Sequence, residues 1–497
     1  MGFVLEETTI RQIHDAFRGG TLNCVSLAQR YLDRISAYDK KGPALNAFVV
    51  LNPNALADAK QLDDAFAKSG KFLGPLHGIP IAVKDQAETK GIETSFGSVA
   101  LKGYVPDQDA TIVTKLKQAG AVILGKTTMP DFAASWYGYG SVHGETKDPY
   151  ALERDPGGSS AGTGVAVAAN LATVGIGEDT GGSIRLPASA NNLVGVRVTP
   201  GLISRAGLSP LVVFQDTAGP LARTVADAAI LLDVLVGYDP KDKYTTAFTI
   251  AGHKSSYTGS LNRDGLKGAR IGVLKEAFGN DDDTDCAQVN AVVRAAIAAM
   301  KKEGADLVDV SLPNLKEFIE ETSLYIIHSR HDINNFLAAR PKLPYRTIDD
   351  IYKAGKYHKN HELIEAIVKD GPLKPEDDPS YYRKLAAREA FQRAVVGLIA
   401  EHNLDTICFP ACRVLTPTHE ELRRGRWTVL TYPTNTVIAA QSWLPSICLP
   451  AGFSPAGIPV GMEMIVPPYH EPDLFRFGYV FEQSTHWRRP PASAPPL

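Results

Sequence analysis

The sequence predicts an α/β fold in which a large mixed, mostly parallel β-sheet is covered by helices on both faces. From Gly74 onward, short apolar segments typical of buried strands alternate with amphipathic segments of helical periodicity. With 44% hydrophobic and 22% charged residues, the composition is that of an ordinary globular protein with a sizeable core. The 497 residues exceed a typical domain, but a large sheet with an insertion accommodates them as one compact unit.

Four parts are expected along the chain. Residues 1–70 form an N-terminal helical arm, because apolar residues recur there at helical spacing. Residues 71–312 supply the core of the sheet. Residues 313–403 form a helix-rich insertion, with more charged and aromatic residues, that covers the substrate side. Residues 404–497 complete the core with strands and a final helix, followed by a tail whose composition predicts disorder.

Local signals within the core predict individual elements. Residues 79–83 form a buried strand that ends at Lys84, and residues 121–127 form a second strand. Between them, a helix begins with Asp109 as its N-cap and ends at Gly120. The same patterns predict helices at 223–235, 288–300 and 472–485, strands at 269–274, 305–313 and 405–410, and a hairpin-like pair of strands at 446–466.

The stretch 156–187 contains two Gly-Gly-Ser turns, at residues 157–159 and 181–183. The run between them, VAVAANLATVGIG, is small and apolar enough to be fully buried. Backbone groups of polar turns need partners when they are buried. Two such turns around one buried element therefore indicate a site, although a single one would more simply be a Gly-rich connection.

Lys84 ends an apolar strand in the segment Ile-Pro-Ile-Ala-Val-Lys-Asp. Lysine is rarely fully buried, and desolvation disfavours its charged form and lowers its pKa. A neutral lysine is a competent general base. The alternative is a lysine that extends from the strand end to solvent.

Ser183 follows Thr180, Gly181 and Gly182 in the second turn. If this turn is tight, its backbone N–H groups form a concave nest suited to a phosphate or to the oxyanion of acyl transfer. Ser159, in the first turn, is placed to lie between Ser183 and a base, because a hydroxyl both donates and accepts a proton.

Lys84, Ser159 and Ser183, with the segments around them, resemble the amidase signature family of Ser–Ser–Lys serine hydrolases. The matching segments are GPLHGIPIAVKD, AGAVILGKTTMPDFA, DPGGSSAGTGVAVAANLATVGIGEDTGGSIRLPAS and QDTAGPLARTVADAA, with weaker matches at GLKGARIGVL, LPSICLPAG and GIPVGMEMI. The resemblance implies the amidase signature fold and an enzyme that hydrolyses the C–N bond of a linear amide without a metal or cofactor. The segments YVFEQSTHWRRPP and QDTAGPLARTVADAA resemble the peptide amidase branch.

By this resemblance, Ser183 is the nucleophile that forms an acyl-enzyme. Ser159, which follows a cis peptide bond, relays the proton of Ser183 to neutral Lys84. The backbone from Thr180 to Ser183 forms the oxyanion hole. Asp179 and Arg185 are expected to brace the turn, unless they form a surface ion pair. Ala133 and the loops near Phe214 and Trp443 are expected to shape the acyl pocket. Three aromatic residues either line the pocket or pack in the core: Trp136, Tyr137 and Tyr139.

The sequence departs from the family pattern outside the triad. Thr128 stands where Asn is usual, Ala161 replaces a Gly of the GGSSGG motif, and Arg197 and Val198 replace Lys and Pro. Activity is therefore expected, while the packing around the triad and the substrate preference could differ from those of the family.

Two other functions remain open. Within the same superfamily, the chain could be the glutamine-hydrolysing subunit of a tRNA amidotransferase, which would need a stable partner chain. A phosphate- or nucleotide-binding module would use the Gly-rich turns, but neither GxxxxGK[ST] nor GxGxxG after a strand occurs at the centre.

Two clusters imitate metal sites without matching their motifs. Asp281, Asp283 and Asp285 imitate a calcium loop, but Cys286 and Val292 stand where the loop needs Gly and Glu. The order of the nearby histidines and glutamate does not match a zinc motif either: His358, His361 and Glu362. Five scattered cysteines fit reduced thiols.

The net charge and the hydrophobic pattern limit the kinds of binding partner that are expected. A net charge of −3 gives no footprint for nucleic acid or an anionic membrane, and no run approaches the ~18 apolar residues of a membrane span. No signal peptide is visible, so a cytoplasmic location is expected, although a mature secreted form would look the same. The expected partner is a small amide or a short peptide amide, bound by a monomer or homodimer. The substrate candidates are peptide C-terminal amides and aryl or alkyl amides.

Overall fold

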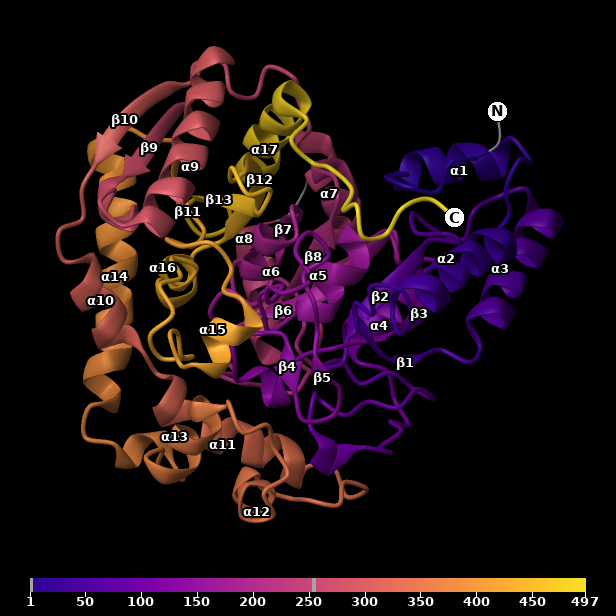
Figure 1. The fold of residues 1–497 in the computed structure, drawn as a ribbon, viewed down its shortest axis with the longest axis horizontal. Coiled ribbons are helices and arrows are strands. Elements are labelled where there is room, and N and C mark those ends of the chain that lie inside the picture. The colour runs from indigo at the N-terminus through magenta and orange to yellow at the C-terminus, as the bar shows by residue number, and fades with distance from the viewer. Residues whose placement is uncertain (1–2, 253–255) are drawn as a thin grey trace.

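The computed structural model describes residues 3–252 and 256–497, and its centre is a mixed sheet of 11 strands (Figure 1). The strand order is β1-β3-β2-β6-β8-β7-β12-β13-β11-β9-β10. The strands are β1 Phe48–Leu51, β2 Pro80–Lys84, β3 Val122–Thr127, β6 Val174–Asp179, β7 Val194–Arg197, β8 Thr217–Ala222, β9 Arg270–Leu274, β10 Asp306–Val310, β11 Thr406–Pro410, β12 Ser446–Phe453 and β13 Pro459–Ile465, with a separate short hairpin of β4 Tyr139–Gly140 and β5 Gly144–Glu145.

The sheet is mixed, but it is not mostly parallel, which corrects that part of the prediction. Parallel pairs are β2–β3, β2–β6, β9–β10 and β9–β11. Antiparallel pairs outnumber them: β1–β3, β6–β8, β7–β8, β7–β12, β12–β13 and β11–β13. Direct reversals such as the β12–β13 hairpin dispense with the crossover helix that parallel neighbours require.

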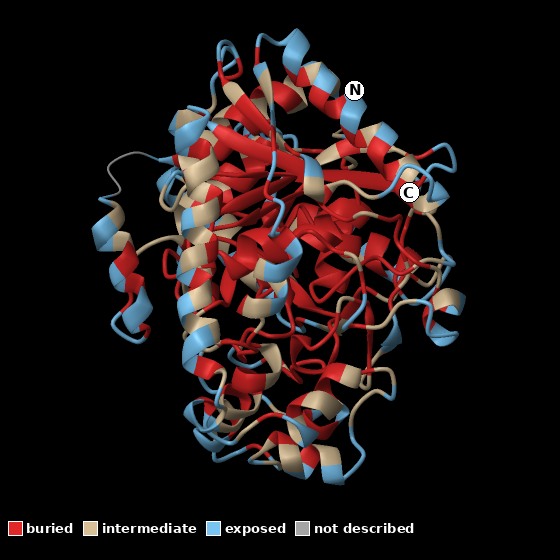
Figure 2. Ribbon diagram, turned by 90° about the vertical axis from the view of Figure 1, so that its left-hand side faces the viewer, coloured by how far each residue is buried: buried red, intermediate tan, exposed pale blue. Residues whose placement is uncertain are grey.

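Helices cover both faces of the sheet, and the buried residues concentrate between them (Figure 2). On β12, Ile447 and Leu449 pack with α17 (Glu471–Thr485), while the intervening Cys448 belongs to the cluster that holds α6 (Arg185–Ala190). Since successive side chains of a strand point to opposite faces, α17 and α6 lie on opposite faces. Every residue of α5 (Ala161–Ala168), which contacts α6, is buried.

The helices predicted at 109–120, 223–235 and 288–300 form with shifted ends. The helix predicted at 288–300 begins earlier, because the Asp283 side chain caps it. Asp109 is not an N-cap: the helix begins after Ala110, and Asp109 instead accepts a hydrogen bond from the Lys90 N–H and pairs with Lys117. The predicted helices are α4 Thr111–Gln118, α7 Val225–Leu235 and α9 Thr284–Lys302. Three further helices have no counterpart in the sequence prediction: α8 Thr246–Ala251, α15 His419–Arg423 and α16 Val437–Gln441.

The insertion at 313–403 is helical, as the sequence indicates. Two of its helices, α10 (Leu315–Thr322) and α14 (Tyr381–Glu401), contact each other along one side of the sheet (Figure 1). The others gather at one end of the molecule: α11 Tyr325–Ala338, α12 Ile348–Lys353 and α13 Glu362–Lys369.

The N-terminal arm contains α1 (Ile10–Arg18), α2 (Cys24–Tyr38) and α3 (Ala55–Ser69), and also a strand that the sequence analysis missed. β1 pairs antiparallel with β3 at the edge of the sheet, so the arm is part of the core rather than purely helical.

The C-terminal tail is ordered against this arm, which corrects the prediction of disorder. Arg34 donates hydrogen bonds to the carbonyls of Ala494 and Pro495, and the Tyr38 hydroxyl also donates to Pro495. Ala494 is buried. A buried guanidinium needs acceptors, and the tail carbonyls supply them.

Among the helices of 3–252 and 256–497, none has the length and apolar character needed to cross a bilayer.

Candidate active site

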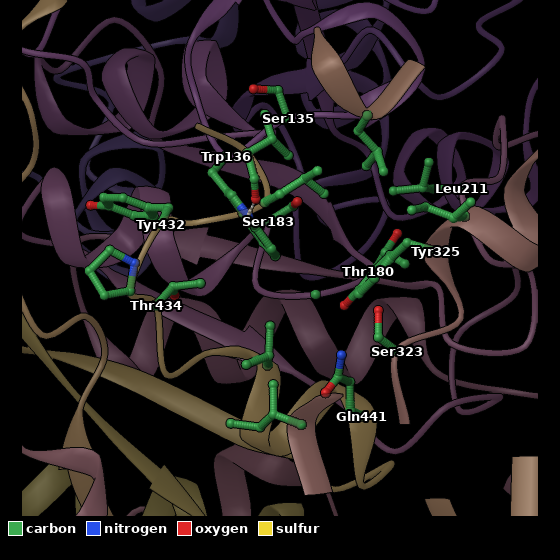
Figure 3. Close-up of a pocket in the computed structure, with 18 of the residues that line it drawn as sticks. Ser135, Trp136, Thr180, Ser183, Leu211, Ser323, Tyr325, Tyr432, Thr434 and Gln441 are labelled. Carbon is green, nitrogen blue, oxygen red and sulfur yellow. Dashed lines mark hydrogen bonds between the residues drawn. The ribbon is translucent and has the colours of Figure 1, made fainter. Parts of the chain in front are cut away.

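A cavity of about 460 Å³ opens beside Ser183 (Figure 3). Its walls are largely apolar and come from the loops after β3 and β6, from the insertion, and from α16 with the segment before it. Charged side chains also line it, at Lys316, Glu320 and Arg413. The apolar lining includes Trp136, Leu211, Ile319, Ile326, Leu363, Val429, Leu430, Tyr432, Pro433 and Val437.

Lys84 and Ser159 are in direct contact. The Lys84 Nζ lies 2.8 Å from the Ser159 Oγ, and both residues are buried. Lys84 is the last residue of β2, which lies between β3 and β6, and it is only 1% exposed, so it does not extend to solvent from the strand end. Burial lowers the pKa of Lys84, although the Glu178 carboxylate opposes this shift.

The two Gly-Gly-Ser turns lie side by side. The peptide bond between Gly158 and Ser159 is cis. The N–H of Ser160 donates to the carbonyl of Ser183 at 3.1 Å, which fixes the second turn against the first. Ser183 itself lines the cavity, and its hydroxyl makes no hydrogen bond to another described residue.

The backbone N–H groups of the second turn are available to a ligand. Within the described chain, none of the N–H groups from Thr180 to Ser183 donates a hydrogen bond to a protein acceptor. Gly182 has φ +148°, and a Cβ there would lie 1.9 Å from the Thr436 Oγ1. Glycine is therefore required for this turn to adopt its shape.

A buried ionic network braces the turn. Asp179 accepts hydrogen bonds from the Ile184 N–H, from Arg185 and from Arg197, at 2.9 to 3.1 Å. Burial raises the pKa of Asp179, but the two guanidinium groups outweigh it and hold that pKa at about 2. Arg185 also donates to Glu463 at 2.7 Å. The two residues expected to brace the turn do so, and they are fully buried rather than a surface ion pair.

Sequence reasoning missed Arg197 and Glu178 as parts of the site. In the sequence Arg197 stands out only as a departure from the family pattern, yet in the structure it donates to Asp179. Glu178 lies within hydrogen-bonding reach of Lys84. No local pattern marks Glu178, because its contact with Lys84 depends on the pairing of β2 with β6.

The pocket candidates separate into two groups. Ala133 and Trp136 line the cavity, whereas Tyr137 and Tyr139 pack in a buried cluster, so core packing holds for them. The N–H of Ala133 already donates to Pro130. Phe214 and Trp443 do not line the cavity, and their rings pack on Arg388 instead. Their loops reach the cavity wall through neighbouring residues, Leu211 and Gln441.

The residues that resemble metal ligands in the sequence interact with other protein side chains instead. Asp281 pairs with Arg294, and Asp285 with Arg426. His361 lies 3.0 Å from Asp131. Across residues 3–252 and 256–497, no group of three or more His, Cys, Asp or Glu side chains has an arrangement that could hold a metal ion.

Comparison with known proteins identifies the family of this chain. The family model described as Amidase matches residues 26–475. The chain belongs to the amidase family. A glutamyl-tRNA(Gln) amidotransferase subunit of Microcystis aeruginosa is 34% identical to this amidase over 97% of this chain and 98% of its own. A probable amidase of Arabidopsis thaliana is 31% identical over 98% of this chain and 92% of its own.

A solved structure extends the likeness to the fold. The peptide amidase from Stenotrophomonas maltophilia superimposes with a TM-score of 0.86 at 34% identity, covering 99% of each chain. The amidase fold inferred from sequence is thus confirmed, and so is the enzyme class, a hydrolase acting on amide C–N bonds.

Proposed function

We propose that this amidase cleaves its amide through an acyl-enzyme on Ser183, with neutral Lys84 as the base and Ser159 as the proton relay. The observation that carries the proposal is the 2.8 Å contact between the Lys84 Nζ and the Ser159 Oγ, both buried, at the first of two turns that are hydrogen-bonded together. A neutral amine has a lone pair that accepts the Ser159 proton across this contact.

The reaction runs through two acyl transfers. Ser183 attacks the amide carbonyl while its proton passes to Ser159 and the Ser159 proton passes to Lys84. The developing oxyanion is bound by the free N–H groups between Thr180 and Ser183. The same relay returns a proton to the leaving amine, and water then hydrolyses the acyl-enzyme. Apart from that water, each of these steps uses groups of this chain alone.

We assign the substrate to amides that carry a sizeable apolar group, with C-terminal peptide amides as the leading class. Support comes from the largely apolar walls of the 460 Å³ cavity and from the similarity to peptide amidase. A cavity of this volume buries most of the surface of a ligand that fills it.

The glutamine-hydrolysing subunit of a tRNA amidotransferase is the second candidate, favoured by the 34% identity to the Microcystis aeruginosa protein. That function predicts efficient glutaminase activity and co-purification with partner chains. Glutamine is small and polar, so the apolar walls favour the first candidate.

The experiment is to assay a panel of amides, including glutamine and C-terminal peptide amides, for released ammonia. The Ser183→Ala and Lys84→Ala variants should lose turnover by about 10³-fold or more, and intact-mass analysis should trap an acyl adduct only when Ser183 is present. Ser442→Ala is the matched control, because its buried hydroxyl bonds only carbonyls of its own helix. Full turnover in Ser183→Ala overturns the mechanism, and preferred hydrolysis of glutamine overturns the substrate assignment.

A further inference from the structure

A second cavity, of about 500 Å³, lies next to the same catalytic network. Glu178 and Asp216 contribute to its lining, together with residues of α11 and of the loop before β8. No residue that lines the substrate cavity also lines this one. Glu178 therefore contacts Lys84 while it lines a cavity other than the one assigned to the substrate.

The contact between Lys84 and Glu178 is close and buried. The Lys84 Nζ donates to the Glu178 carbonyl oxygen at 3.1 Å and lies 3.5 Å from the carboxylate Oε2. The two side chains are 2% and 1% exposed. They come from β2 and β6, which pair in parallel with Val83 opposite Ile176, so the sheet register holds them together.

The hydroxyl of Thr180 lies between two buried carboxyl groups. Its Oγ1 lies 2.6 Å from the Asp216 Oδ1 and 3.2 Å from the Glu178 Oε1. A hydroxyl has one proton and can donate to only one of them. For both contacts to be hydrogen bonds, Glu178 or Asp216 must carry a proton. Burial raises the pKa of both carboxyl groups, in agreement with this count.

The other charged groups around Glu178 are already paired. Asp179, its neighbour in the strand, is held by Arg185 and Arg197. Across the second cavity, the charged and titratable side chains have partners of their own: Arg205 with Asp242, Arg340 with Glu88, His328 with Asp332, and His331 with Asn335 and the Leu373 carbonyl. Among the described residues, Lys84 is the one cation within 4 Å of the Glu178 carboxylate.

We propose that Glu178 is a positioning residue for Lys84: its carboxylate holds the Lys84 amine beside Ser159, and its charge sets the pH range in which Lys84 serves as the base of the proposed acyl transfer. Loss of that charge should let Lys84 become neutral at lower pH. Glu178 lines the second cavity, which shares no lining residue with the cavity assigned to the substrate.

The test is the pH profile of kcat/KM for Glu178→Gln, with a C-terminal peptide amide as substrate. Glutamine keeps the shape but cannot hold the charge that stabilises the Lys84 ammonium. The acid limb of the profile, where Lys84 loses its proton, should move to lower pH by about one unit or more. An acid limb that coincides with that of the unmodified enzyme overturns the proposal.

Glu471→Gln is the matched control, because Glu471 is also buried and accepts a backbone hydrogen bond, from Thr199, but contacts none of the triad. Its acid limb should not move. If Glu178→Gln does not fold, Glu178→Ala takes its place: its acid limb should also fall, and added formate, which can enter the second cavity, should move it back. An acid limb of Glu178→Ala that stays in place with and without formate overturns the proposal.

This inference rests on the proposed function, and the assays separate the two. Turnover by Ser183→Ala would overturn the acyl-enzyme mechanism itself. An inactive Ser183→Ala together with an unmoved limb in Glu178→Gln would overturn only the role of Glu178.

Discussion

The N–H of Ser160 donates to the carbonyl of Ser183, at 3.1 Å, and this bond joins the two Gly-Gly-Ser turns of the chain. Ser160 begins the buried helix α5, and Ser183 precedes the buried helix α6. Because α5 and α6 pack on the same face of the sheet, the two turns have little freedom to separate. The proposed relay from Ser183 toward Lys84 would therefore depend on rigid elements rather than on mobile loops.

The pH dependence of the enzyme should report the buried position of Lys84. Burial lowers the pKa of Lys84, so the amine becomes neutral at a lower pH than an ordinary lysine. We expect kcat/KM to rise with pH as Lys84 deprotonates and to reach its plateau below the ordinary lysine pKa of 10.5. A kcat/KM profile from about pH 5 to about pH 11 checks this, spanning the range between ordinary carboxyl and lysine pKa values. A limb at or above 10.5 would contradict the role of Lys84 as base.

Gly182 should tolerate no side chain. In Gly182→Ala the new Cβ meets Thr436 and the positive φ adds strain of about 1–3 kcal/mol, so the turn must shift. We expect kcat to fall by about 10²-fold or more, because the N–H groups beside Ser183 lose their alignment. Steady-state kinetics and the melting temperature would be measured together.

Gly144→Ala is the control for the effect of backbone strain alone. Gly144 also has a positive φ, +79°, but a Cβ there meets nothing within 4 Å. This variant should lose some stability and keep its kcat. Equal loss of kcat in both variants would show that the contact with Thr436 is not what matters.

Removal of Arg185 should lower the free energy of unfolding more than removal of any other arginine of the site. It bridges the carboxylates of Asp179 and Glu463 while fully buried, and truncation leaves both without this partner. We expect Arg185→Ala to lower the free energy of unfolding by about 3–5 kcal/mol. Urea denaturation measures this. The control is Arg18→Ala, whose ion pair with Asp15 is mostly exposed and should change stability by less than about 1 kcal/mol.

Trp136 should contribute to the recognition of large substrates. Its ring lies against Gly181, and its Nε1 donates to the Val429 carbonyl at 2.8 Å, so it forms a fixed wall of the cavity. We expect Trp136→Ala to reduce kcat/KM for bulky apolar amides by roughly 10-fold to 200-fold, or about 1–3 kcal/mol, and to reduce it less for acetamide. A uniform loss for every substrate would instead indicate a disturbed turn at Gly181.

The sequence by itself determined the family, the class of reaction, and the residues that are the strongest catalytic candidates. Lys84, Ser159 and Ser183 lie in local motifs, and the strand before Lys84 and the two glycine turns could be recognised from a few neighbouring residues. The helical insertion at 313–403 was visible for the same reason, since helical periodicity is a local property.

Only the tertiary structure decided which distant groups meet. The pairing of β2 with β6 brings Glu178 to Lys84, and the pairing of β1 with β3 makes the N-terminal arm part of the sheet. The C-terminal tail has the composition of a disordered segment, yet the buried Arg34 binds its carbonyls. Strand pairing and burial depend on contacts between segments far apart in the chain, so no local pattern carries them.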